Sequence, residues 1–133
     1  MVQVRNPFSH IDQRVPDLEA GVAFYGAWLP EVGFSKYLGG QAFRCWATPE
    51  GEGPRQPWFG ITLGEGEPPN ANRVAFWVES REEVDRIAEL LREAGARDIS
   101  GPKLMPEYLK SYYAVFFSDP WGNPLEVLHW TDD

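Results

Sequence analysis

The chain contains two helical segments that occur in the same setting, and this internal repeat constrains the fold most. Residues 80–94 show the stronger helical pattern, because Ser80 can cap a helix and the apolar positions after it recur at helical spacing. Residues 17–29 follow Asp17 in the same way. When the first helix is shifted by 63 positions along the sequence, Asp17 aligns with Ser80. The apolar core positions of the first helix then align with apolar core positions of the second. The pattern therefore predicts a duplicated unit.

Aromatic and β-branched runs bounded by Gly, Pro and Asp surround both helices and predict strands. These strands are 7–14, 34–38, 42–48 and 57–63 in the first half, and 73–79, 97–100, 112–118 and 124–130 in the second. Each half has the order βαβββ, and the Gly/Pro/Asn-rich stretch 64–72 links repeat 7–63 to repeat 73–130. We expect a single α+β domain over residues 1–133, in which two βαβββ repeats form curved mixed sheets around a shared cleft.

Composition narrows the classes of function. The 133 residues carry 12 basic and 20 acidic side chains, a net charge of −8, which suits neither nucleic acid nor an anionic membrane and modestly favours a cationic ligand. No apolar run is long enough for a membrane helix, and the N-terminus lacks the apolar core of a signal peptide. The single cysteine, Cys45, cannot form an internal disulfide, so we expect a cytoplasmic protein.

Three motifs resemble the vicinal oxygen chelate superfamily, which comprises glyoxalases, bleomycin resistance proteins and dioxygenases. The run YAVFFSDPWGNPLEVLHW at 113–130 is similar to its strand, DPxGN turn and strand signature. RVAFWV at 73–78 is similar to its "HIAFxV" strand except at the first residue, and FSHID at 8–12 is similar to its first strand. The resemblance implies the glyoxalase-like fold, a small-molecule substrate or ligand, and a homodimer.

The resemblance also implies a metal site. His10 matches the first-strand histidine, and Glu126 matches the glutamate of the last strand, which in relatives is both ligand and catalytic group. Histidine and carboxylate can hold a divalent ion such as Zn, Ni, Mn or Fe and leave positions open for substrate oxygens. The family's third ligand position holds Arg73, whose guanidinium has no lone pair for a metal. The fourth lies near 59–62 (FGIT), which has no His or carboxylate.

Arg73 has three interpretations that the sequence leaves open. It can pair with Glu126 and neutralise the site without a metal. It can bind a carboxylate or phosphate of a ligand through two parallel hydrogen bonds. If its strand begins later than predicted, it points to solvent.

Four aromatic residues are candidates for lining the cleft. Trp77 shares a strand face with Arg73, and Tyr113 is the cleft candidate of the Tyr112–Tyr113 pair if the family's register holds. Trp46 and Trp58 are possible neighbours. Such side chains could stack on a planar or cationic ligand, and the alternative for each is ordinary aromatic core.

The turn Asp119–Pro124 (DPWGNP) is interpreted as backbone chemistry rather than catalysis. Asp119 can form an Asx turn, Pro120 fixes its own φ, and Gly122 can adopt positive φ before the last strand. The turn would then position Glu126.

Two functions are consistent with these residues. One is a glyoxalase-like lyase, an isomerase or a dioxygenase that uses His10, Glu126 and a divalent metal. The other is a metal-independent binding protein of the bleomycin-resistance type. Retention of both His10 and Glu126 favours the enzyme, whereas Arg73, the acidic charge and the six Trp favour the binding protein.

Overall fold

The structure is a computed structural model and describes residues 7–49, 56–65 and 69–132. The chain divides into two compact units, one ending at residue 67 and the other beginning at residue 68. The boundary falls in the predicted link 64–72, of which residues 66–68 lie outside the described part. None of the described helices is long and apolar enough to cross a membrane.

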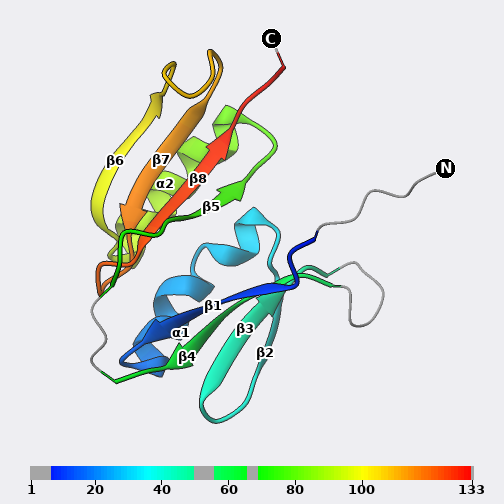
Figure 1. The fold of residues 1–133 in the computed structure, drawn as a ribbon, viewed down its shortest axis with the longest axis vertical. Coiled ribbons are helices and arrows are strands. Elements are labelled where there is room, and N and C mark those ends of the chain that lie inside the picture. Colours follow the sequence, from blue (N-terminus) through cyan, green and yellow to red (C-terminus); the bar gives the residue numbers. More distant parts are fainter. Residues whose placement is uncertain (1–6, 50–55, 66–68, 133) are drawn as a thin grey trace, which may run out of the picture. The chain divides into compact units, whose positions relative to one another are not determined.

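The first unit is a four-stranded mixed sheet with one helix on it (Figure 1). Its strands run in the order β1-β4-β3-β2; β1 and β4 are parallel and the other pairs antiparallel. In chain order the elements are β1 (His10–Val15), α1 (Leu18–Gly26), the 3-10 helix η1 (Leu29–Val32), β2 (Lys36–Gly39), β3 (Phe43–Ala47) and β4 (Trp58–Leu63). The core lies between α1 and the sheet, where Tyr25 packs on Phe59 with ring centroids 5.3 Å apart.

The second unit repeats this topology. Its strands run in the order β5-β8-β7-β6, with β5 and β8 parallel, and α2 covers one face (Figure 1). The elements are β5 (Val74–Trp77), α2 (Arg81–Ala94), β6 (Arg97–Leu104), β7 (Tyr113–Ser118) and β8 (Pro124–His129). The predicted α+β fold of two βαβββ units is therefore confirmed. The cleft shared by the repeats stays a prediction.

The ends of α2 follow the capping residues in the sequence. The Ser80 hydroxyl accepts a hydrogen bond from the Glu83 N–H at 3.1 Å, and the Glu83 carboxylate accepts one from the Glu79 N–H at 2.8 Å. Gly95 ends the helix with a φ of +88° and donates to the carbonyls of Leu91 and Arg92. Asp17 caps α1 in the same way, through the Ala20 N–H at 3.0 Å.

Two elements end at least three residues from their predicted C-terminal ends. The helix predicted over 17–29 ends at Gly26, because a proline at position 30 has no N–H for the Gly26 carbonyl and its ring would clash with that carbonyl. Pro30 instead lies in the first turn of η1, which begins at Leu29. The strand predicted over 97–100 continues to Leu104, since the register of β6 against β7 shifts twice and brings Lys103 opposite Ala114.

Candidate functional site

Glu126 lies at the centre of the second sheet, on the face that α2 does not cover. It pairs with Ala75 of β5 and Phe116 of β7, and its residue surface is only 4% exposed. One carboxylate oxygen lies 3.8 Å from an amino nitrogen of Arg73, just before β5. The other oxygen accepts a hydrogen bond from the Tyr112 hydroxyl. This buried carboxylate therefore has a protein partner at each oxygen.

The Arg73 contact bears on the three interpretations of that residue. Its ion pair with Glu126 agrees with neutralisation by Arg73. The guanidinium also lies 4.8 Å from the ring centroid of Phe116, while the Arg73 side chain remains 43% exposed. A residue in this position can pair with Glu126 and still contact a ligand.

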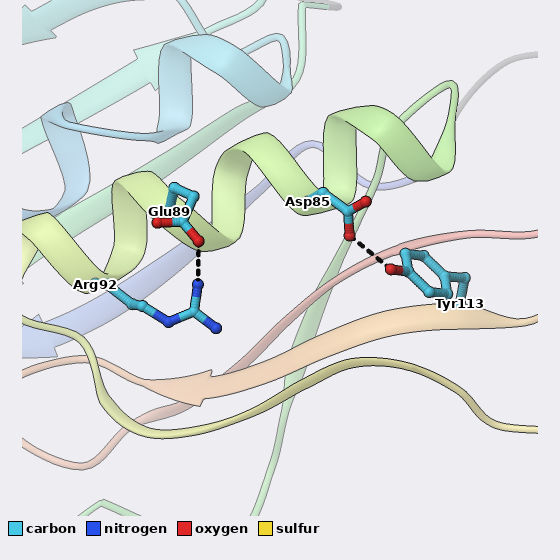
Figure 2. Close-up of polar contacts among 4 residues, drawn as sticks. All are labelled: Asp85, Glu89, Arg92 and Tyr113. Atoms are coloured by element: carbon cyan, nitrogen blue, oxygen red, sulfur yellow. Dashed lines mark hydrogen bonds and ion pairs between the residues drawn. The ribbon is translucent and has the colours of Figure 1, made fainter.

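Tyr112, rather than Tyr113, is the tyrosine on the Glu126 face. Ser118 pairs with Pro124 across the turn, so Phe116 comes opposite Glu126 and the even-numbered positions before it share that face. Tyr113 lies on the helix side, where its hydroxyl donates to Asp85 of α2 at 2.6 Å (Figure 2). The expectation for Tyr113 is thus corrected, and counting back from the turn would have identified Tyr112.

Burial and the contact with Glu126 change the acidity of Tyr112. Burial is the largest cause that raises the pKa of its phenol, followed by the hydrogen bond to Glu126 and the charge of Glu126, with a smaller opposing effect of Arg73. An unfolded tyrosine loses its proton near pH 10, whereas native Tyr112 retains it to higher pH. The native state then binds more protons, so this contribution to the free energy of unfolding is complete below pH 10 and is lost as pH rises further.

We expect Tyr112→Phe to reduce the decrease in the free energy of unfolding at alkaline pH. Between pH 10 and 11 the parent should lose roughly 0.5 kcal/mol more than the variant, a small value because water screens the half-buried hydroxyl. Urea unfolding at a series of pH values measures this. Tyr37→Phe, at an exposed position, is the control. Equal pH slopes for the parent and Tyr112→Phe would contradict the Tyr112–Glu126 contact.

In the first sheet, His10 stacks on an aromatic ring rather than standing apart. The imidazole of His10 lies parallel to the Trp58 indole, with ring centroids 3.9 Å apart and an interplanar angle of 1°. The two residues are paired between β1 and β4, and His10 is exposed. His10 Nδ1 also lies 3.0 Å from the Ser9 hydroxyl. His10 and Trp58 therefore form one stacked pair of rings on the face that α1 does not cover.

Gly60 corresponds in the first unit to Glu126 in the second. Each is the third residue of its strand; Gly60 pairs with Asp12 as Glu126 pairs with Ala75. A Cβ placed on Gly60 would lie 2.6 Å from the Trp58 ring. The indole thus covers the position from which a fourth ligand would project. It also makes that position unsuited to a larger side chain.

The two remaining tryptophan candidates occupy different environments. Trp77 pairs with Leu128, which shares the Glu126 face, and it is 43% exposed. Trp46 pairs with Phe59 on the helix side of the first sheet and is 2% exposed. The expectation that Trp46 lines a binding face is corrected, because Trp46 packs in the core beside Tyr25.

The donor set does not fit a resident divalent metal. Within the described ranges, no group of three or more His, Cys, Asp and Glu side chains could hold an ion. Arg73 and Gly60 stand at two of the four expected positions and offer no lone pair. His10 and Glu126 are each already in contact with a neighbouring side chain. Two such ligands fall short of the three or more that metal sites of this kind use.

Comparisons with known proteins agree with this architecture. The model of the Glyoxalase/Bleomycin resistance protein/Dioxygenase superfamily matches residues 8–127. A Bacillus subtilis (strain 168) protein described as uncharacterized protein YqjT is 27% identical over 122 residues, which cover 84% of this chain and 89% of that one.

Two solved structures show the same fold. The crystal structure of a glyoxalase/bleomycin resistance protein from Albidiferax ferrireducens T118 has a TM-score of 0.77 at 25% identity, and the match covers 95% of this chain and 100% of that one. The fosfomycin resistance protein FosX from Listeria monocytogenes has a TM-score of 0.69 at 19% identity, with 97% of both chains covered. At that identity, the likeness to FosX extends to the fold alone.

Proposed function

The chain belongs to the Glyoxalase/Bleomycin resistance protein/Dioxygenase superfamily, and we propose that it binds a small organic molecule without a resident divalent metal. The ion pair between Arg73 and Glu126 carries this proposal. Arg73 stands where metal-dependent relatives are expected to have a histidine, and it pairs with Glu126, the carboxylate at the other expected ligand position of its sheet. A cation supplied by the protein then takes the place of the metal charge.

The open sheet faces support a binding role. Each unit presents aromatic surface on the face away from its helix: the stacked pair of His10 and Trp58 in the first, and Trp77 with Phe116 in the second. Exposed or half-buried rings on a rigid sheet can stack on a planar ligand with little loss of conformational entropy. We expect the ligand to contact these rings.

The second candidate function is a lyase, isomerase or dioxygenase that uses a divalent metal. His10 and Glu126 favour it, because both stand at positions where the family resemblance implies metal ligands. It requires at least one further ligand and the release of Glu126 from Arg73.

Calorimetric titration of chelator-treated protein with Mn²⁺, Ni²⁺ and Zn²⁺ tests the proposal. We expect either no binding at micromolar concentration or weak binding that His10→Ala and Glu126→Gln leave unchanged. Glu126→Gln is used because the amide keeps the shape of the side chain and still accepts a hydrogen bond from Tyr112. Micromolar or tighter binding that both substitutions abolish would overturn the proposal in favour of the metal enzyme.

A further inference from the structure

Two cations meet at one aromatic ring on the open face of the second sheet. The Arg73 guanidinium lies 4.8 Å from the Phe116 ring centroid, and the Lys103 ammonium lies 5.9 Å from the same centroid. Phe116 pairs with Glu126 on one side and with Ser100 on the other. The two cations therefore reach one ring from the two edge strands of the sheet, Arg73 from just before β5 and Lys103 from β6.

The local charge at this row is positive although the chain carries −8. Glu126 offsets only one of the two cations. The Lys103 ammonium donates to the neutral Ser100 hydroxyl at 2.8 Å, and no carboxylate of the described residues lies within ion-pair distance of it. Arg73 and Lys103 are both exposed, so an incoming group can reach them. An anion at this position would relieve their mutual repulsion.

Glu126 is not available to bind a cationic ligand. Its residue surface is 4% exposed, and its oxygens already face Arg73 and Tyr112. A cation would have to displace Arg73 from this buried carboxylate, so the attraction gained by the ligand is offset by the loss of the existing ion pair. Local geometry therefore outweighs the modest preference for cations that the net charge predicts.

Resting on the proposed metal-independent binding, we propose that the ligand is an aromatic molecule with an acidic group, held by Arg73 and Lys103 over Phe116. Arg73 can donate several N–H groups to a carboxylate or phosphate in a fork, and Lys103 adds a point charge. Trp77, exposed on the same face, provides a ring against which the aromatic part can stack.

NMR titration of the EDTA-treated protein with four small aromatic probes tests this proposal. Benzoate and phenyl phosphate are the anionic probes and distinguish a carboxylate from a phosphate; benzyl alcohol is neutral and benzylamine is cationic. The amide signals of Phe116 and Lys103 and the Trp77 indole N–H report on the site. We expect at least one anionic probe to bind about tenfold more tightly than benzyl alcohol, as the gain of charge-assisted hydrogen bonds implies.

Substitutions test whether Arg73 and Lys103 cause the preference for anionic probes. Lys103→Gln and Arg73→Gln should each lower the affinity for the anionic probe by about fivefold to tenfold and leave the affinity for benzyl alcohol unchanged. Lys103→Gln removes an exposed side chain and should not disturb folding, so it keeps the test valid if Arg73→Gln is unstable. Arg92→Gln is the matched control, because Arg92 pairs with Glu89 on the surface of α2 (Figure 2).

Three outcomes overturn the inference and leave metal-independent binding in place. The first is binding of benzyl alcohol or benzylamine at least as tightly as both anions. The second is an anion preference that survives Lys103→Gln and Arg73→Gln together. The third is no signal change with either anion. By contrast, probe binding that requires added Mn²⁺ or Zn²⁺ and disappears in His10→Ala would overturn the proposed function itself.

Discussion

Asp119→Ala should lower the free energy of unfolding by about 3 kcal/mol, because it removes three hydrogen bonds in a buried turn. The residue is 0% exposed. One oxygen accepts from the backbone N–H groups of Trp121 and Asn123, each at 2.9 Å, and the other accepts from the Asn123 side-chain amide at 2.7 Å. Alanine would leave these donors without their acceptor in the protein interior. Urea unfolding measures the loss.

Two further substitutions make the Asp119 test specific. Asp119→Asn keeps one oxygen but turns its amide nitrogen toward a donor, so about half the loss is expected. Asp85→Ala removes a carboxylate that accepts from Tyr113 at an exposed position and should cost less than about 1 kcal/mol. If Asp119→Ala is no more harmful than Asp85→Ala, the carboxylate does not hold the turn.

This turn also determines which residues reach the candidate site. It pairs Ser118 with Pro124, and that closing pair places Phe116 beside Glu126. A change of one residue in the turn would exchange the two faces of β8 relative to β7. The interpretation of DPWGNP as a positioning turn agrees with these contacts, since its carboxylate is used by the backbone of the turn.

The repeat and the helices could be predicted because their signals are local. Ser80, Asp17 and Gly95 end helices through hydrogen bonds that depend on a few neighbouring residues. The pairing of Arg73 with Glu126 was one of three predicted alternatives, since the repeat aligned Arg73 with His10 but could not fix the length of β5.

The sequence predicted less well on which face of a sheet each aromatic residue lies. The residues 45–47 are consecutive and apolar, so alternation did not separate Trp46 in the core from an exposed position. Lys103 was missed because the predicted strand ended at residue 100. Two register shifts extend β6 instead, and Gly101 adopts a φ of +102° within it.

Glu126→Ala should lower the free energy of unfolding of the metal-free protein by about 3 kcal/mol. The substitution leaves the Tyr112 hydroxyl without its acceptor and Arg73 without its anion, and it opens a space in a buried position. Glu126→Gln should cost only about 1 kcal/mol, because the amide fills the same space and accepts from Tyr112, while the exposed Arg73 can turn to water.

The sign of the Glu126→Gln effect separates the two candidate functions in the presence of EDTA. A buried carboxylate kept for a metal is destabilising when the metal is absent, so its neutral amide would raise the stability of the metal-free protein. A carboxylate kept for Arg73 stabilises the metal-free protein, so the amide lowers it. Urea unfolding of the parent and Glu126→Gln, with Glu89→Gln as an exposed ion-pair control, measures this difference. A stabilised Glu126→Gln protein would contradict the assignment of Arg73 as the partner that replaces the metal.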